Sequence, residues 1–319
     1  MKRIGVMTSG GDAPGMNAAI RAVVREAISL DMEVFGIMRG FEGLLDGDIK
    51  KLEWTSVGDI LQRGGTILRT ARSKRFLDPA NQEKAAEVLR TFEIEGLVII
   101  GGDGSLHGGL KLSKLGIPVM GLPGTIDNDL AYTDYTIGFD TAVNTILGLI
   151  SNIRDTSSSH ERTTVVEVMG RRCGDIALYA GLAGGADVIM VPEVPADIHK
   201  IVRNVLRGQS SGKLHSIIMR AEGSEIGTNE LVKTLEEMTN REVKAVVPGY
   251  IQRGGSPTSN DRILASLTGA KAVQLLYDDE ESKAIGICQG EIVAYDLEEA
   301  LNMKAEFNQQ MYELAEILT

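Results

Sequence analysis

The chain has 319 residues, a length that fits two domains of common size better than one core. Its formal net charge of −11 argues against a nucleic-acid partner, yet small anionic substrates held by a few local arginines remain compatible with it. We expect no membrane segment and no signal peptide, because no apolar run is long enough and Met1–Val6 leads directly into a strand-like run. The two distant cysteines, Cys173 and Cys288, favour a reducing cytoplasm.

Short apolar runs rich in β-branched residues alternate with helical stretches. In chain order the sequence predicts strands at 3–8, 33–37, 96–100, 118–122, 163–169, 188–191, 216–219 and 243–247, and helices at 16–30 and 297–318. Strands that are apolar on both faces are typical of parallel sheets covered by helices, which predicts a doubly wound α/β fold. Ligands of such folds bind at the carboxyl ends of strands. The polar run Arg154–His160 is the best candidate for a mobile or inter-domain segment.

Two glycine-rich segments follow predicted strands and open helices. The segment Thr8–Asn17 offers free N–H groups and a helix dipole to an anion, but it matches neither a P-loop nor a dinucleotide fingerprint. A tight strand-to-helix turn would give the same pattern. The segment Ile99–Ser105 ends a strand in two glycines, which let a backbone approach phosphates. Its Asp103 could hold Mg²⁺, although a helix cap is the simpler alternative.

The third segment is Pro123–Asp129. Pro123 and Gly124 predict a turn after the strand, and Thr125 offers a hydroxyl and an N–H group. Asp127 and Asp129 stand two residues apart, close enough to divide the roles of proton acceptor and metal partner. An Asx-turn loop would use the same residues, but the position after a parallel strand favours a functional loop.

The three segments, together with Met169-Gly170-Arg171 and the run Gln252–Pro257, resemble bacterial ATP-dependent 6-phosphofructokinase. The resemblance covers essentially the whole chain, in order and at matching spacing. It implies two doubly wound three-layer domains with largely parallel sheets. Residues 1–138 plus about 256–304 would bind ATP, and residues 139–255 plus about 305–319 would bind the sugar phosphate. The implied reaction moves the γ-phosphate of ATP to the 1-hydroxyl of fructose 6-phosphate, the committing step of glycolysis, with Mg²⁺ as cofactor.

The resemblance also assigns roles in the catalytic centre. Asp127 would be the general base, Asp103 would organise the metal, and Asp129 would lie near it. Thr125, Arg72 and Arg171 would stabilise charge on the transferring group. The residues expected to hold ATP are Gly11, Arg72, Ser73, Gly102, Asp103, Gly104 and Ser105.

A second set of matching residues would hold the sugar phosphate. It comprises Thr125, Ile126, Asp127, Arg162, Met169, Gly170, Arg171, Glu222, Lys244, Tyr250 and Arg253. In the family, Arg162 and the residue near 244 reach in from a neighbouring subunit, which implies a homotetramer. Lys244 and Tyr250 stand where the family usually has an arginine and a histidine, and a lysine binds phosphate as a point charge rather than as a fork.

The resemblance further implies an effector site for ADP or phosphoenolpyruvate. Its matching residues would be Arg21, Arg25, Arg154, Gly185, Asp187 and Lys213. Ser211 and Leu214 replace basic residues there, and Asp187 replaces a longer glutamate. We therefore expect weakened allosteric control, because an anion site that loses cations loses affinity.

Three alternative classes of protein can be compared with this sequence at individual positions. Pyrophosphate-dependent relatives carry Asp at the position of Gly104 and Lys at that of Gly124, so the two glycines favour ATP as donor. Kinases of NAD or lipids share Gly-Gly-Asp-Gly but lack the remaining motifs. A catalytically inactive nucleotide-binding regulator would be expected to lose Asp127, Asp103 or Arg171, and all three are present.

Overall fold

The computed structural model describes residues 1–318 and divides the chain into two compact units. Unit 1 comprises Met1–Thr141 and Arg253–Ala305, and unit 2 comprises Ala142–Gln252 and Glu306–Thr319. The assignment of ATP to residues 1–138 plus about 256–304, and of the sugar phosphate to the remainder, stays a prediction. Thr319, which ends the predicted segment 305–319, lies outside the described residues.

Unit 1 is built on an eight-stranded sheet of order β12-β11-β5-β4-β1-β2-β3, with β6 paired to β5. Its strands are β1 (Arg3–Ser9), β2 (Glu33–Ile37), β3 (Ile49–Leu52), β4 (Gly96–Gly101), β5 (Val119–Thr125), β6 (Ile137–Gly138), β11 (Lys283–Cys288) and β12 (Glu291–Asp296). Only the edge strands β3 and β12 run antiparallel to their neighbours. The central strands β1, β4 and β5 are buried along nearly their whole length, as continuous apolar runs predict.

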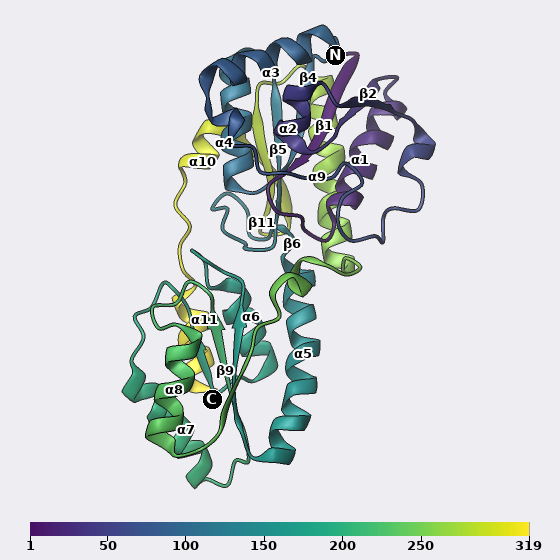
Figure 1. Ribbon diagram of the computed structural model, residues 1–319. Coiled ribbons are helices and arrows are strands. Elements are labelled where there is room, and N and C mark those ends of the chain that lie inside the picture. Colours follow the sequence, from purple (N-terminus) through teal and green to yellow (C-terminus); the bar gives the residue numbers. More distant parts are fainter. Residues whose placement is uncertain (319) are drawn as a thin grey trace. The chain divides into compact units, whose positions relative to one another are not determined.

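Helices cover both faces of this sheet (Figure 1). They are α1 (Met16–Ser29), α2 (Gly40–Asp46), α3 (Pro79–Thr91), α4 (Asp103–Lys114), α9 (Ser259–Tyr277) and α10 (Leu297–Asn302). Helices α1 and α9 pack together on one face, where Gly269 allows close approach to Ala22. On the other face, α2, α3, α4 and α10 share one hydrophobic core with the strands. Their starts follow local rules, as in α3, where Asp78 caps the helix and Pro79 is its first residue.

Unit 2 contains a four-stranded, fully parallel sheet of order β10-β7-β9-β8. Its strands are β7 (Thr163–Val168), β8 (Val188–Met190), β9 (Ser216–Ala221) and β10 (Val243–Val246). Its helices are α6 (Asp175–Gly184), α7 (Ile198–Ser210), α8 (Thr228–Thr239) and α11 (Gln309–Ile317), together with most of α5 (Phe139–His160). Helices α7 and α8 share a core with the sheet, and α6 and α11 pack against β8. The predicted fold class, two layered α/β domains with largely parallel sheets, is confirmed.

Two predicted segments differ from the structure. The run Arg154–His160 is not a mobile or inter-domain segment but the last two turns of α5. Two of its three serines make tertiary contacts, because Ser157 pairs with Thr164 and Ser158 with His215. The single helix predicted from Leu297 to Leu318 is also wrong, because α10 ends at Asn302 and a new helix begins only where Asn308 caps α11.

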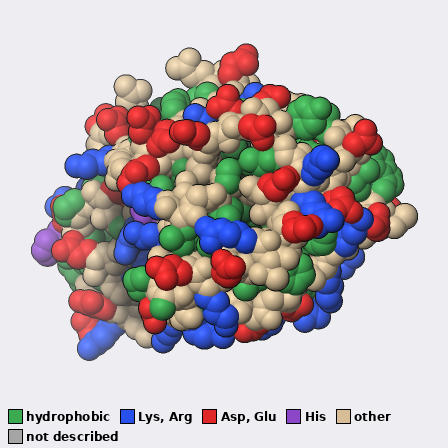
Figure 2. All heavy atoms as spheres, turned by 90° about the horizontal axis from the view of Figure 1, so that it is seen from above, with side chains coloured by type: hydrophobic (Ala, Val, Ile, Leu, Met, Phe, Trp, Pro, Cys, Tyr) green, Lys and Arg blue, Asp and Glu red, His purple; other side chains and the backbone are tan. Residues whose placement is uncertain are grey.

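The surface carries charges of both signs. Figure 2 shows acidic and basic side chains interspersed over the face that it presents. Among residues 1–318, no helix is long and apolar enough to cross a membrane.

Candidate active site

The three glycine-rich segments follow three neighbouring strands of unit 1 and lie at one edge of the sheet. β4 lies between β1 and β5, and all three are parallel. Ser9 is in register with Gly101, and Gly101 with Pro123, so β1 and β4 end at the same level and β5 continues to Thr125. The loops that follow therefore meet at the carboxyl edge of the sheet, where doubly wound folds bind ligands.

The loops approach one another at three glycines, of which Gly101 leaves no room for a side chain. A Cβ on Gly10 would lie 3.1 Å from Ser105 Oγ, and Gly10 also has a φ of 89°. On Gly101 a Cβ would lie 2.7 Å from the carbonyl oxygen of Ser9. On Gly102 it would lie 3.4 Å from Thr125 Cβ. The structure thus brings the predicted ATP-binding loop 102–105 against both the first loop and the third.

Asp103 is the first residue of α4, and Gly102 occupies the cap position, so Asp103 does not act as the helix cap. Its half-exposed carboxylate lies 3.1 Å from His107 Nδ1. The free N–H groups and dipole of this helix end favour anions. Residues 1–318 contain no cluster of three metal-ligating side chains. A single carboxylate at a helix N-terminus that favours anions nevertheless fits Mg²⁺, which usually takes one or two carboxylates plus substrate phosphates and water.

The third loop differs from its predicted turn. Pro123 and Gly124 do not turn but continue β5, which ends at Thr125. Gly124 can stay extended because it pairs with Ile137 of β6. The turn comes later, at Asn128, whose φ is 55° and whose side chain accepts a hydrogen bond from Thr136 N.

Two contacts fix the loop around the predicted base. The backbone N–H of Asp127 donates to Thr125 Oγ1 at 3.2 Å, and Thr136 Oγ1 donates to the Thr125 carbonyl at 2.7 Å. Asp127 and Asp129 are both partly buried. Ile126 is fully buried, so its side chain belongs to the core and only its backbone can face a ligand.

Sequence reasoning missed the role of Asn17. Its buried side chain donates to the carbonyls of Arg63 and Gly64 and accepts from Ile67 N. It thereby ties the start of α1 to the segment that leads to Arg72. The only local signal was a polar residue at the second position of a helix, which by itself gives no partner.

Arg72 is exposed, and Ser73 Oγ accepts a hydrogen bond from Phe76 N. The neighbouring Arg75 is engaged with the carboxylates of Glu42 and Asp46. Of the basic residues around position 72, Arg75 is therefore committed to a structural network, whereas the exposed Arg72 is accessible to a ligand.

Arg253 lies against the first loop in unit 1. Its Nη1 donates to the Asp12 carbonyl at 3.2 Å, and a Cβ on Gly11 would lie 2.5 Å from the same nitrogen. The guanidinium of Arg253 therefore covers Gly11, and a side chain at position 11 would have to displace it.

In unit 2, Arg162 and Lys244 share one carboxylate. Arg162 Nε lies 2.5 Å from one oxygen of Glu242, and Lys244 Nζ lies 2.6 Å from the other. Contact with Lys244 first, and then with Arg162, holds the pKa of Glu242 below its usual value. The structure thus groups the two cations that the family resemblance assigns to a neighbouring subunit's site.

The other sugar-phosphate candidates of unit 2 follow β7 and β9. Glu222 N donates to the Val168 carbonyl, and Gly223 N donates to that of Gly170. Gly170 has a φ of 131°, and Met169 N donates to Gln252. Arg171 and Glu222 are exposed. Tyr250 is 85% exposed. These residues thus lie at the carboxyl ends of neighbouring strands, as the doubly wound pattern predicts.

Comparison with known proteins decides the family. The model of the family described as Phosphofructokinase matches residues 3–276. The chain belongs to the phosphofructokinase family. It is 57% identical over 319 residues, with 100% of both chains covered, to a protein of Clostridium tetani named ATP-dependent 6-phosphofructokinase. A Clostridium botulinum (strain Loch Maree) protein of the same name is 56% identical over the same length.

Solved structures of phosphofructokinases agree. That of phosphofructokinase from Saccharomyces cerevisiae is 38% identical, with a TM-score of 0.89 over 94% of this chain. That of Pichia pastoris phosphofructokinase in the T-state is 34% identical, with a TM-score of 0.91 over 99% of this chain. This chain spans 45% and 36% of those two chains. A pyrophosphate-dependent phosphofructokinase from Marinobacter aquaeolei shares the fold at 22% identity, with a TM-score of 0.87 over 100% of this chain and 91% of its own.

Four of the effector-site candidates of this phosphofructokinase lie together in unit 2. Arg154 donates to the carbonyls of Gly184 and Gly185, and Lys213 forms an ion pair with Asp187. Asp187 is almost buried and also accepts from a backbone N–H group. Its carboxylate is thus already engaged by the chain.

The other two candidates lie on α1 of unit 1. The Arg25 guanidinium stacks 4.5 Å from the ring centroid of Trp54. Burial, and then the charge of Arg25, lowers the pKa of Arg21. Two neighbouring cations favour an anion.

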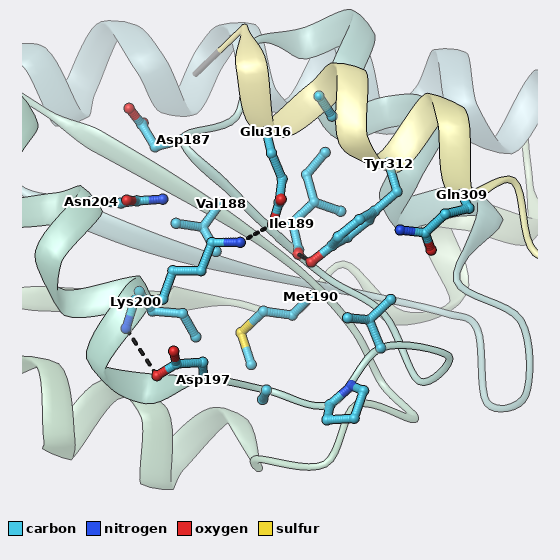
Figure 3. A pocket seen from close by; sticks show the side chains of 15 residues that line it. Asp187, Val188, Ile189, Met190, Asp197, Lys200, Asn204, Gln309, Tyr312 and Glu316 are labelled. Carbon is cyan, nitrogen blue, oxygen red and sulfur yellow. Dashed lines mark hydrogen bonds and ion pairs between the residues drawn. The ribbon is translucent and has the colours of Figure 1, made fainter.

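A pocket of about 380 Å³ lies in unit 2 between β8, α7 and α11 (Figure 3). Lys200 reaches across it to Glu316, and Tyr312 donates to the Ile189 carbonyl. Asp187 is its only lining residue among the site candidates. The pocket thus belongs to unit 2 and contains one of the predicted effector residues.

Proposed function

We propose that this protein is an ATP-dependent 6-phosphofructokinase. It transfers the γ-phosphate of ATP to the 1-hydroxyl of D-fructose 6-phosphate and releases fructose 1,6-bisphosphate and ADP, the committing step of glycolysis. The observation that carries the proposal is the meeting of three glycine-rich loops at one sheet edge, with Asp103, Thr125 and Asp127 on them. The relatives from Clostridium, similar over their full length, support the same activity.

Phosphoryl transfer requires mainly positioning and stabilisation of charge. Asp127 accepts the proton of the sugar hydroxyl as a general base. Thr125 lies beside it and donates to the transferring group, and the exposed cations Arg72 and Arg171 stabilise its charge.

The nucleotide is held by the first two loops. Its phosphates lie against Gly11, Arg72, Ser73 and the segment Gly102–Ser105, where the N-terminus of α4 favours negative charge. Asp103 would hold Mg²⁺, and Asp129 would lie near it. When bound, the ion neutralises charge on the phosphates.

The sugar phosphate is held mainly by unit 2. The residues proposed for this are Thr125, Ile126, Asp127, Arg162, Met169, Gly170, Arg171, Glu222, Lys244, Tyr250 and Arg253. Arg162 and Lys244 would serve a neighbouring subunit, so we propose a homotetramer. The effector residues Arg21, Arg25, Arg154, Gly185, Asp187 and Lys213 would bind ADP or phosphoenolpyruvate weakly. We place the enzyme in the cytoplasm, where its substrates are formed.

Substitution of Asp127 tests the proposal. In Asp127→Ser, kcat with fructose 6-phosphate and MgATP should fall by at least about 100-fold, because general-base catalysis is typically worth about 10²–10⁴. Asp31→Ser, at an exposed aspartate after α1, is the matched control and should keep wild-type turnover. A smaller loss in Asp127→Ser would exclude Asp127 as the base, and no turnover by the wild type would exclude the activity.

A further inference from the structure

Residues 58–74 form an irregular segment that carries Arg72 and contains no helix or strand. We call it the Arg72 segment. Irregular chain of this length is uncommon inside a compact domain and is usually functional. Backbone of this kind moves freely unless side chains from elsewhere hold it. In this protein the side chains that hold it come from the end of β1 and the start of α1, and they determine where the backbone beside Arg72 lies.

Asn17 makes three hydrogen bonds to the first part of the Arg72 segment. Its side-chain nitrogen donates to the Arg63 carbonyl at 3.1 Å and to the Gly64 carbonyl at 3.2 Å. Its side-chain oxygen accepts from Ile67 N at 2.8 Å. An amide is the side chain that offers two donated hydrogens and an acceptor in one planar group. Asn17 is 1% exposed, so the buried amide would lose its partners if the segment moved away.

The second part of the Arg72 segment is attached to Thr8 and to the loop that follows β1. Thr8 Oγ1 donates to the Arg69 carbonyl at 2.8 Å. Thr70 Oγ1 donates to the Gly10 carbonyl at 2.8 Å. Because Thr70 stands two residues before Arg72, the backbone that carries the arginine lies beside the first glycine-rich loop.

We propose that Asn17 is a positioning residue for Arg72. Its three hydrogen bonds fix the course of the chain at residues 63–67, and the bonds at residues 69 and 70 continue that course to the edge of the sheet. The backbone beside the exposed Arg72 is therefore in place before phosphates bind, and less ordering is needed in the transition state. The inference rests on the proposed function, in which Arg72 stabilises charge on the transferring group.

A double-mutant cycle with Arg72 tests this role. The kcat with fructose 6-phosphate and MgATP is measured for Asn17→Ala, for Arg72→Ala and for the double variant. In the wild-type background, Asn17→Ala should lower kcat by at least about tenfold, because a displacement of about 1 Å can cost about 10²-fold. In the Arg72→Ala background, the same substitution should change kcat by less than about twofold, because the group that Asn17 positions is already absent.

Two further variants separate positioning from stability. Val273→Ala shortens a fully buried side chain of α9, so it should lower the midpoint of thermal unfolding but keep kcat within about twofold of the wild type. Thr70→Ala, at a partly buried position, removes the hydrogen bond to Gly10 and should repeat the pattern of Asn17→Ala in the same cycle. If Asn17→Ala does not fold, the cycle of Thr70→Ala with Arg72→Ala decides.

The outcomes distinguish this role from the proposed function. An unchanged kcat in folded Asn17→Ala, or in Thr70→Ala where Asn17→Ala does not fold, overturns the role of Asn17 and leaves the activity intact. Equal losses with and without Arg72 also overturn it, because the effect would then not pass through the guanidinium. An equal loss in Val273→Ala would assign the effect to stability alone. Absence of turnover in the wild type would instead exclude the proposed function, and this inference with it.

Discussion

Gly104 and Gly124 are surrounded very differently. A Cβ on Gly104 would meet nothing within 4 Å, so the position opens into space that a ligand can fill. A Cβ on Gly124 would lie 2.8 Å from Ile100 Cγ2 and 3.1 Å from Gly101 N. Packing alone therefore requires a glycine at 124 in this chain, and the choice of phosphate donor rests mainly on Gly104.

This contrast predicts opposite outcomes for two substitutions. Gly104→Asp should keep the wild-type unfolding midpoint but raise KM for ATP at least about tenfold, because it places a carboxylate beside the nucleotide phosphates. Gly124→Ala should lower the free energy of unfolding by about 1–3 kcal/mol, the usual cost of overpacking. Urea unfolding measures the stability of each variant, and a coupled enzyme assay measures its KM for ATP. Unchanged ATP kinetics in Gly104→Asp would remove the physical basis for the choice of donor.

At the scale of elements, the predicted strands and helices match the structure where a local sequence pattern determines the element. The central strands could be predicted because they are continuous apolar runs, and their parallel order brings the three glycine-rich loops together. The sequence could not show that β5 continues through Pro123, because pairing with the distant β6 keeps it extended. Nor could it place Asn17 or Arg253, whose partners lie 46 to 50 and 241 residues away. The break before α11 was readable from Asn308 as a helix cap.

The contact between α5 and the segment before β9 predicts a pH effect. His215 Nδ1 pairs with Ser158 at 2.7 Å, and burial, then Arg154, lowers its pKa, with Lys213 acting in the same direction and Asp187 opposing it. Because the unfolded chain takes up a proton more readily, this contribution to stability is present above about pH 6.5 and is lost as pH falls below it. The thermal midpoint should therefore fall more between pH 7.5 and 5.5 in the wild type than in His215→Gln. An equal fall of the thermal midpoint in the two proteins would contradict the assignment of this pH effect to His215.

At the scale of the molecule, the two units contain different groups of candidate site residues. Unit 1 carries the three glycine-rich loops and the proposed base, and unit 2 carries the cations Arg162 and Lys244, which share the carboxylate of Glu242. The effector candidates are also divided, with Arg21 and Arg25 in unit 1 and the other four in unit 2. Asp187 already forms an ion pair with Lys213, which leaves less free charge for an anionic effector.

We therefore expect ADP to have only a weak allosteric effect on this enzyme. In a fructose 6-phosphate titration at fixed MgATP, micromolar ADP should leave the half-saturating concentration within about twofold, because Ser211 and Leu214 supply no charge to an anion site. A strong shift at micromolar ADP would show that the remaining cations suffice.

The most direct test of the account identifies the donor and the products together. The purified protein is incubated with fructose 6-phosphate and Mg²⁺, and with either ATP or pyrophosphate, and the reaction is followed by phosphorus NMR. We predict fructose 1,6-bisphosphate and ADP in equal amounts with ATP, and no turnover with pyrophosphate. Phosphorylation from pyrophosphate, or no bisphosphate from ATP, would contradict the account.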